Sequence, residues 1–232
     1  MLRIILNWLK AKAEELLAED QAGFRPGWST VEKIFNNRVI TEKHLQHQRD
    51  LFHNFVDFKK ACDRVWHVGL WQVLRSFNMH KGLVQAIQAI HENSSSAILL
   101  NSQLRELFKT TGGVRQGCLL STILFNLFLE KIMQETLHNH HTSISIGGRP
   151  ICNLRFADDF DLMGGSYDEL QDLTKRLVDR ARHMERKSAQ KRGRSRPTAR
   201  TTSVQILAWT VKVRGGMARA CHMPWQPLQT SL

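Results

Sequence analysis

Apolar side chains recur every three to four positions over several stretches of the chain, which is the spacing of a helix with one buried face. The stretch Gln21–Thr30 breaks this pattern with Gly23, Pro26 and Gly27 and is predicted to be a loop. The periodic stretches predict helices over Leu2–Leu17, Val31–His47, Gly69–Phe77, Leu83–Glu92 and Ile123–Leu137.

Two further stretches have the pattern of strands. Leu51–Phe58 (LFHNFVDF) is short, apolar and aromatic, which is typical of a buried strand, yet a carboxylate, Asp57, lies near its end. Ile151–Met163 alternates between apolar and polar residues on both sides of an acidic pair. We expect a hairpin there with Asp158 and Asp159 at its tip.

Composition limits the class of protein. The chain has 232 residues, of which 42% are hydrophobic, so a packed core is expected. No apolar run approaches the roughly 18 residues of a membrane span, and the first residues lack the pattern of a secretory signal. Four scattered cysteines without a CxxC pair favour neither a disulfide framework nor a zinc module. We therefore expect an intracellular protein, in the nucleus or the cytoplasm, without a membrane partner.

Positive charge is concentrated at one end of the chain. The formal net charge is +12, but residues 1–182 contribute +3 and residues 183–232 contribute +9. Such an excess of cations favours polyanionic partners, nucleic acid above all. The basic, Ser-, Gly- and Pro-containing segment after His183 cannot bury much apolar surface. We expect a folded domain over residues 1–182 and a disordered basic tail over residues 183–232.

The acidic pair is the first candidate for chemistry. Adjacent carboxylates repel each other, and a divalent cation shared with a third ligand relieves the repulsion. Asp57 is the natural third ligand of Asp158 and Asp159. Carboxylates of this kind support two-metal phosphoryl transfer, in which the ions lie about 3.5 to 4 Å apart. A solvated Asp-Asp turn is the alternative, since Asp favours turns for local hydrogen-bonding reasons.

Four ordered stretches resemble one known family. They are QAGFRPGWST, FVDFKKACDRV, GVRQGCLLSTILFNLFL and FADD. Together they resemble the reverse transcriptases of non-LTR, LINE-type retrotransposons. The resemblance covers about residues 1–182. It implies an α+β, right-hand polymerase fold, in which a palm of antiparallel sheet backed by helices carries partial fingers.

The resemblance also implies an activity and its partners. The family copies an RNA template onto a DNA primer from deoxynucleoside triphosphates, with two Mg²⁺ ions or, alternatively, Mn²⁺. By position, Asp57 and Asp158 would bind the metal ions, and Asp159 would support them electrostatically.

Other matched positions would contact the substrates. Phe58 would contribute its backbone carbonyl. Gln116 and Gly117 would lie against the incoming nucleotide, where a glycine permits close backbone approach. Arg25 would contact template phosphate, with a solvated loop charge as the equal alternative.

Departures from the family pattern matter at three positions. Cys62 stands where the family usually has Phe, the aromatic plate that excludes a ribose 2′-hydroxyl, so weaker discrimination against ribonucleotides is expected at this nucleotide-binding position. Trp28 replaces a usual Arg, and Thr122 replaces a usual Pro. None of the three replaces a metal carboxylate.

The resemblance begins after the family's first finger motifs and stops after Arg182. We expect a partial enzyme, and the abrupt change in composition at residue 183 suggests a change of reading frame in the gene. Three functions remain open at this stage. They are an active RNA-directed DNA polymerase, a catalytically dead remnant, and a basic nucleic-acid-binding protein.

Overall fold

The chain forms two compact units in the computed structural model. The helical unit comprises Met1–Glu19, Lys60–Thr136 and Asp179–Val204, and the sheet unit comprises Asp20–Lys59, Leu137–Val178 and Gln205–Leu232. The structure describes residues 2–58, 60–92, 94–104, 106–109, 112–115, 117–191, 206–214 and 217–220. No helix among these residues is long and apolar enough to cross a membrane.

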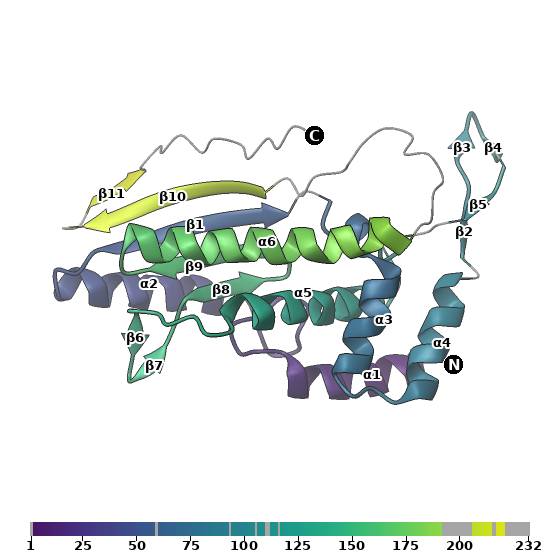
Figure 1. Ribbon diagram of the computed structural model, residues 1–232, viewed down its shortest axis with the longest axis horizontal. Coiled ribbons are helices and arrows are strands. Elements are labelled where there is room, and N and C mark those ends of the chain that lie inside the picture. The colour runs from purple at the N-terminus through teal and green to yellow at the C-terminus, as the bar shows by residue number, and fades with distance from the viewer. Residues whose placement is uncertain are drawn as a thin grey trace. The chain divides into compact units, whose positions relative to one another are not determined.

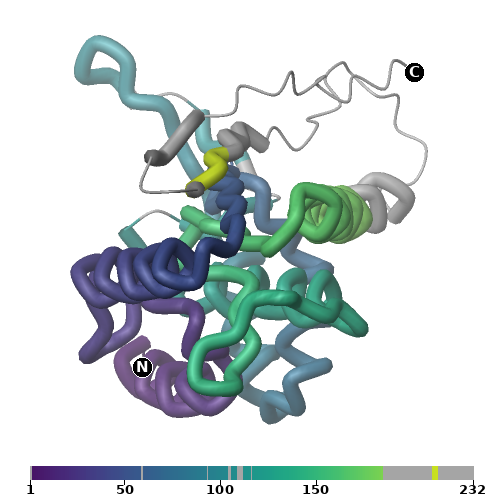
Figure 2. The backbone as a smooth tube through the Cα atoms, turned by 90° about the vertical axis from the view of Figure 1, so that its left-hand side faces the viewer, coloured from purple at the N-terminus to yellow at the C-terminus, as the bar shows by residue number. Residues whose placement is uncertain are grey.

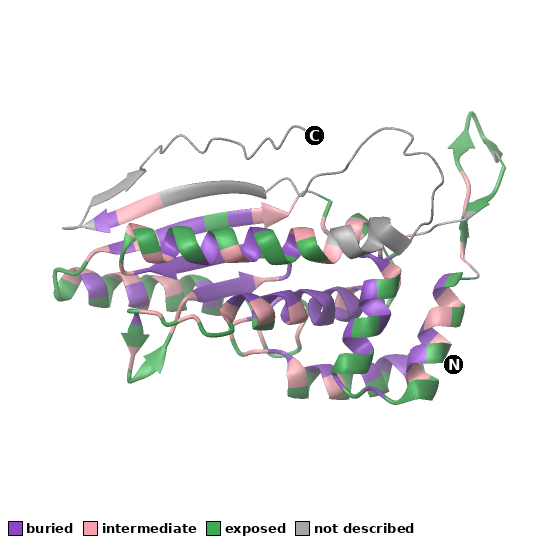
Figure 3. Cartoon of the chain, in the orientation of Figure 1, coloured by how far each residue is buried: buried purple, intermediate pink, exposed green. Residues whose placement is uncertain are grey.

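The helical unit is built from amphipathic helices and one mostly apolar helix. Its elements are α1 (Leu2–Leu16), the 3-10 turn η1 (Cys62–Arg64), α3 (His67–Ser76), α4 (Lys81–Glu92), the short strands β2 (Ser95–Ser96), β3 (Leu99–Leu100), β4 (Gln103–Leu104) and β5 (Phe108–Lys109), and α5 (Ser121–Leu137). Twelve of the 17 residues of α5 are buried, which Figure 3 shows as an almost continuous run of purple. A helix that is apolar on all sides is stable only when it is covered on all sides.

The sheet unit contains a five-stranded antiparallel sheet in the order β11-β10-β1-β9-β8 among the described residues (Figure 1). The strands are β1 (Leu51–Phe58), β8 (Asn153–Phe156), β9 (Asp159–Gly164), β10 (Ile206–Arg214) and β11 (Met217–Ala220). A second, small hairpin of β6 (Ser145–Ile146) and β7 (Arg149–Pro150) lies outside this sheet. Strand β1 is central and pairs along its length with β9 and β10.

Helices α2 (Thr30–Gln46) and α6 (Tyr167–Lys191) lie on opposite faces of β1, as Figure 2 shows. Consecutive strand residues point to opposite faces. The Asn54 amide donates to the Thr174 hydroxyl of α6 at 2.7 Å. On the other face, His53 lies 3.1 Å from both oxygens of Asp161.

A buried polar cluster ties α2 to the sheet. Asp161 accepts hydrogen bonds from His53 at 3.1 Å and from the Asn37 amide of α2 at 2.6 Å. Burial raises the pKa of the Asp161 carboxyl, and the hydrogen bond and charge of His53 offset part of this effect. The cluster is therefore satisfied, and it sets the position of α2 along the strands.

An apolar core also lies between α2 and the sheet. Its buried members are Ile40, Leu51, Ile144, Leu154 and Met163, with Ile146 and Ile151 packed against them. Burial of such side chains stabilises the unit, at about 25 cal/mol per Å² of apolar surface removed from water.

The predicted elements agree closely with the observed ones in residues 1–182. Strand Leu51–Phe58 has the predicted bounds, and the five predicted helices are present, with ends that differ by a few residues. The hairpin is also present, but its two turn residues are Ala157 and Asp158, because Asp159 already pairs with Phe156 as the first residue of β9.

The structure differs from the expectation for residues 183–232 in three stretches. Helix α6 continues to Lys191, and residues 206–214 and 217–220 form β10 and β11. Helix α6 extends this far because Arg, Lys, Glu and Gln are good helix formers, and β10 forms because WTVKV alternates within an otherwise basic segment. The domain boundary and the change of reading frame stay predictions, and Cys221 lies outside the described residues.

Candidate active site

The predicted carboxylates meet at one end of β1. Asp57 on β1 is the direct register partner of Asp159 on β9, so their side chains project from the same face of the sheet. Asp158 precedes Asp159 in the turn. Asp57 and Asp158 are half-buried, and Asp159 is exposed. We call these three residues the carboxylate end of β1.

Repulsion within the carboxylate end is visible in its electrostatics. The pKa of Asp159 is raised above its usual value by partial burial and then by the negative charges of Asp158 and Asp57. Proton uptake or a bound cation would relieve this repulsion. Asp57 and Asp159 therefore face each other across two strands, with Asp158 next to them in the turn, and the metal role of the three residues stays a prediction.

The turn that presents Asp158 has an unusual backbone. Ala157, its first central residue, has a φ of 58°, in the left-handed region that favours glycine. A positive φ at this position is a feature of the turns that join tightly paired antiparallel strands. A non-glycine residue stays in this conformation only when its surroundings hold it there.

Gln21 holds this turn from a distant part of the sheet unit. Its side-chain oxygen accepts hydrogen bonds from the Ala157 and Gly23 amides at 2.9 and 2.8 Å, and its side-chain nitrogen donates to the Ala157 carbonyl at 3.1 Å. Gln21 is 1% exposed, so these bonds are shielded from water. The glutamine therefore binds both backbone polar groups of the residue next to Asp158.

The loop that carries Gln21 approaches the turn closely. The backbone of Ala22 donates to the Arg155 carbonyl at 3.0 Å, which adds a short parallel bridge beside β8. A Cβ atom on Gly23 would lie 2.2 Å from the Ala157 nitrogen. Only glycine therefore fits at position 23 of this loop.

Arg25 is engaged within the same loop. Its guanidinium donates to the Gln21 carbonyl at 2.8 Å and lies 4.8 Å from the centre of the Trp28 ring. Lys33 lies 5.0 Å from the same ring, and its pKa is lowered chiefly by burial. Trp28, which departs from the family pattern, thus receives two cations on its ring. The predicted template contact of Arg25 stays a prediction.

Within the helical unit, the turn at Cys62 is bound to the loop predicted to meet the nucleotide. The Cys62 carbonyl accepts a hydrogen bond from the Val114 amide at 2.8 Å, and the Val65 carbonyl accepts one from Gly113 at 2.8 Å. Gly113 has a φ of 82° and lies close to the Asp63 backbone. A Cβ atom on Gly113 would lie 3.0 Å from the Asp63 carbonyl oxygen. Two sequence stretches about 50 residues apart are thereby joined.

The residues predicted to contact the nucleotide differ in their surroundings. Cys62 is half-buried, and Gly117 is exposed with a φ of 80° and open space around its Cα. Gln116 lies outside the described residues. Phe58, at the end of β1 in the sheet unit, packs its ring edge-to-face against Phe160 at 5.2 Å. Its predicted carbonyl contact stays a prediction.

A buried aromatic cluster supports the loop of the helical unit. His67 donates through Nε2 to the Gly113 carbonyl at 2.7 Å, and its ring packs against those of Trp71 and His91. Burial lowers the pKa of His91, and the neighbouring His67 and Arg115 lower it further. Trp71 is 5% exposed, so it serves the core.

The donor set at the carboxylate end fits a divalent ion shared with a substrate. Among the described residues, no three His, Cys, Asp or Glu side chains are grouped so that they alone could hold a metal ion. Mg²⁺, however, is commonly bound by one or two carboxylates together with substrate phosphates. Asp57 and Asp158 offer such hard oxygen donors, and the raised pKa of Asp159 marks the excess of negative charge that a cation would neutralise.

The sequence patterns missed two supporting residues. Gln21 was part of a matched stretch, but nothing in its neighbourhood indicates that its side chain reaches Ala157, 136 positions later. His67 had no signal at all, because its partner is a backbone carbonyl. A polar residue followed by two small ones, as in Gln21-Ala22-Gly23, is the kind of pattern that could have drawn attention to the first.

Comparison with known proteins places this geometry in a family. Residues 1–192 match the family Reverse transcriptase (RNA-dependent DNA polymerase). The chain is 28% identical over 163 residues to the Retrovirus-related Pol polyprotein from the type-2 retrotransposable element R2DM of Drosophila melanogaster, covering 68% of this chain and 15% of that protein. It is 27% identical over 150 residues to the probable RNA-directed DNA polymerase from transposon X-element of the same organism, covering 64% and 15%. The chain thus spans only a small part of these relatives.

Solved structures share the fold. Telomerase from Candida albicans, in complex with a TWJ fragment of telomeric RNA, superposes with a TM-score of 0.65 at 13% identity over 96% of this chain and 38% of that chain. This likeness confirms the predicted α+β fold of a polymerase palm. Together with the family match and the retrotransposon relatives, it confirms the resemblance carried by the four motifs, and the chain belongs to the reverse transcriptase family.

Proposed function

We propose that the chain is the polymerase portion of a non-LTR retrotransposon reverse transcriptase and extends a DNA primer on an RNA template. The observation that carries the proposal is the meeting of Asp57 and Asp159 in register, with Asp158 in the adjoining turn. Family membership supports an RNA template, and polymerases of this family generally use divalent metal ions.

The reaction would join the primer's 3′ oxygen to the α-phosphorus of a deoxynucleoside triphosphate and release pyrophosphate. Asp57 and Asp158 would hold two Mg²⁺ ions, with the Phe58 carbonyl as a further donor. Such ions activate the attacking hydroxyl and neutralise the leaving oxygens. Asp159 would add negative charge beside the two ligands, and Gln21 would keep the turn in the conformation that presents Asp158.

The loop of the helical unit would contact the incoming nucleotide. Gly117 has no side chain and open space around it, so a ligand can approach its backbone. Arg115 anchors this loop locally, because its carbonyl accepts a hydrogen bond from the Ser121 hydroxyl at 2.6 Å. Gln116 would lie against the same nucleotide.

Cys62 would set the selectivity for the sugar. Its side chain is smaller than the family's phenylalanine, so a ribose 2′-hydroxyl would meet less obstruction. We predict that Cys62→Phe raises the preference for deoxynucleotides over ribonucleotides by about tenfold, the effect of about 1.4 kcal/mol in differential binding. Single-nucleotide incorporation of the two sugars measures it, with Cys62→Ala as a control that changes the same position without adding bulk. Equal selectivity in wild type and Cys62→Phe would contradict the role.

The proposal is tested by primer extension with purified chain, an RNA template, deoxynucleoside triphosphates and Mg²⁺. Asp158→Ala removes one ligand and should abolish extension. Asp63→Ala is the matched control, because this exposed carboxylate lies outside the carboxylate end. Extension by wild type and by Asp63→Ala, but not by Asp158→Ala, is the expected result.

Absence of extension by folded wild-type protein would overturn the proposal. Saturable binding of nucleic acid without extension would then identify a nucleic-acid-binding protein. Neither binding nor extension would identify a remnant whose motifs record ancestry.

A further inference from the structure

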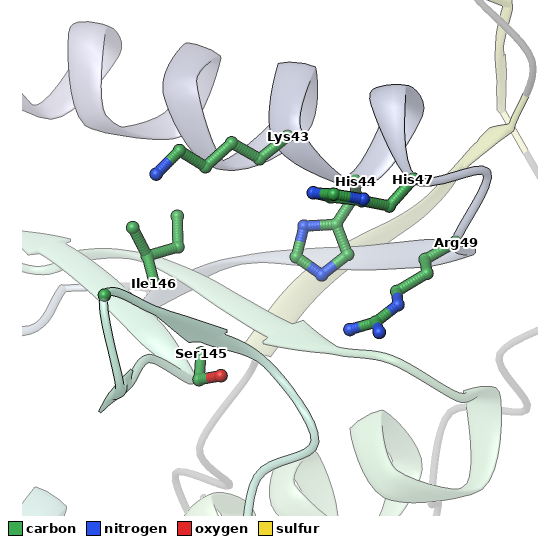
Figure 4. Close-up of a pocket in the computed structure, with 7 residues that line it drawn as sticks. Lys43, His44, His47, Arg49, Ser145 and Ile146 are labelled. Atoms are coloured by element: carbon green, nitrogen blue, oxygen red, sulfur yellow. The ribbon is translucent and has the colours of Figure 1, made fainter.

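A basic pocket lies at the other end of β1. Its volume is about 220 Å³, and it is lined by Lys43, His44, His47, Arg49, Ser145, Ile146 and Gly147 (Figure 4). The first four belong to the end of α2 and the turn that follows, and the others belong to β6 and its turn. All lie in the sheet unit. We call these residues the basic pocket.

The cations of the basic pocket have no acidic partner in the part of the chain that the structure describes. Lys43, His47 and Arg49 are exposed. The carboxylates nearest to them in sequence are committed elsewhere: Glu42 pairs with Arg38 at 2.7 Å and Asp50 pairs with Lys212 at 2.9 Å. The pocket therefore carries uncompensated positive charge.

The end of α2 brings these groups together by a local backbone motif. The Arg49 amide donates to the His44 carbonyl at 2.9 Å, and the Gln48 amide donates to the Leu45 carbonyl at 3.0 Å. Gln48 has a φ of 52°. This is the Schellman motif, which reverses the chain after a helix. It returns Arg49 to the side of His44, as Figure 4 shows.

His44 is held in place for a contact within the pocket. Its Nδ1 lies 2.9 Å from the Ile40 carbonyl, so this nitrogen carries the proton and donates. The residue is 9% exposed, so its ring forms a fixed part of the pocket wall. His44 is thus a preset group, whereas Lys43 and Arg49 are long side chains that can adjust to a ligand.

The wall formed by β6 and its turn leaves room for an extended ligand. Gly147 and Gly148 form the two-residue turn between β6 and β7, with φ values of 60° and 79°. Apart from the residues directly before and after each glycine, no atom lies within 4 Å of a Cβ built on it. Ser145, which is exposed, adds a hydroxyl to this wall.

We propose that the basic pocket binds a phosphate of the single-stranded nucleic acid on which the polymerase acts. Lysine, arginine and hydroxyl donors around a small open pocket match a phosphodiester group. From Leu51 to Asp57, β1 rises about 3.3 Å per residue, so this contact lies about 20 Å from the carboxylate end. The proposal rests on the proposed function for its ligand, and it adds an anchoring site separate from the reacting atoms.

Binding of a fluorescent single-stranded RNA, and of DNA of the same sequence, tests the proposal. Anisotropy is measured against salt concentration in EDTA, so catalysis plays no part. Lys43→Gln with Arg49→Gln removes two positive charges from the pocket. Lys10→Gln with Arg75→Gln is the matched control, because it makes the same change in net charge at exposed cations of α1 and α3.

We expect the pocket variant to bind both strands at least about threefold more weakly than the control. The slope of its affinity against salt should fall by about 0.7 for each phosphate that the variant no longer neutralises. Arg49→Glu should weaken binding further. Thermal unfolding should be unchanged, since both side chains are exposed.

Equal losses of affinity in the two double variants would overturn the proposal, because they would indicate a diffuse electrostatic attraction. The proposal would also be overturned if the pocket variant lost binding to an acidic peptide but kept its binding to nucleic acid. The same holds if it lost only the stabilisation by inorganic phosphate. Primer extension in parallel separates the two hypotheses: extension with equal binding losses refutes only the pocket, and pocket-dependent binding without extension refutes only the polymerase.

Discussion

The two ends of β1 carry opposite charge and are held in different ways. At one end, Asp57 and the Asp158 turn gather negative charge; at the other, Lys43 and Arg49 gather positive charge. Each end depends on a non-glycine residue in the left-handed region, Ala157 with a φ of 58° and Gln48 with a φ of 52°. The same backbone device therefore serves both ends.

The hydrogen bonds that hold Ala157 and Gln48 in this conformation span different separations in sequence. Gln21 reaches Ala157 across 136 positions of sequence, whereas the hydrogen bonds around Gln48 join residues within about one helical turn. A long-range support exists only in the folded protein, but a local cap can form with the helix itself. The carboxylate end should therefore be more sensitive to loss of tertiary structure than the basic pocket.

The largest effect is expected from Asp57→Asn. The substitution keeps the shape of the side chain but removes a charged oxygen ligand, so primer extension should fall by at least about 100-fold. Affinity for RNA should be unchanged or higher, because one negative charge is removed. Steady-state extension and RNA binding measure the two quantities. A similar drop in extension for Asp63→Asn would show that the effect is not confined to the carboxylate end.

Gln21→Ala should follow in size. It leaves the buried amide and carbonyl of Ala157 without their partner, which costs about 2 to 3 kcal/mol of folding free energy. Urea unfolding measures the change, and extension by the folded variant should also fall. Gln21→Glu keeps the two hydrogen bonds accepted by the side-chain oxygen but loses the donated one. Its stability should therefore lie between those of the wild type and Gln21→Ala. Unchanged stability of Gln21→Ala would contradict the support of the turn.

The pH dependence of Asp159 gives a smaller effect. Its pKa is raised above 3.8, so as pH rises from there the unfolded chain releases this proton before the folded chain does. Stability is therefore lost as pH rises through this window and is constant above the raised pKa. Asp57→Asn or added Mg²⁺ should lower the pKa of Asp159. Carboxyl carbon NMR measures it, and an unchanged pKa in Asp57→Asn would contradict the coupling.

The smallest effect is expected from glycine at the two left-handed positions. Gln48→Gly should stabilise the fold by about 0.5 to 1 kcal/mol, because glycine adopts a positive φ without steric cost. Ala157→Gly should gain less, since the Ala157 methyl is buried and its backbone is already held by Gln21. Thermal unfolding of both variants measures the difference. A larger gain at position 157 would reverse the comparison.

Most of the fold was predictable where a single face of an element is buried. The periodicity of Leu170, Leu173 and Leu177 is that of a helix packed on one side, and each of these residues is at most 2% exposed. The strand Leu51–Phe58 was predictable from its short apolar and aromatic run. The prediction failed for β10, because a basic composition around it outweighed a short alternating run.

The candidate site was predictable only in part. Asp57 is recognisable because a carboxylate near the end of a buried strand is costly unless it is paired, and Asp158 and Asp159 are recognisable because adjacent carboxylates repel each other. The basic pocket had no such signal. Lys43 and Arg49 are ordinary surface residues in sequence, and only the reversal of the chain at Gln48 brings them together against β6.

The amino-acid sequence determined the family, five helices, the strand Leu51–Phe58 and the acidic hairpin, because these depend on residue type and local spacing. The tertiary structure decided that Asp159 faces Asp57, that Gln21 holds Ala157, and that four basic residues share one pocket with a glycine turn. The physical reason is that the register of β1 with β9, the reach of Gln21 to Ala157 and the approach of β6 to the end of α2 all join segments that are far apart in sequence. A shift of one residue along a strand would turn each of its side chains to the other face.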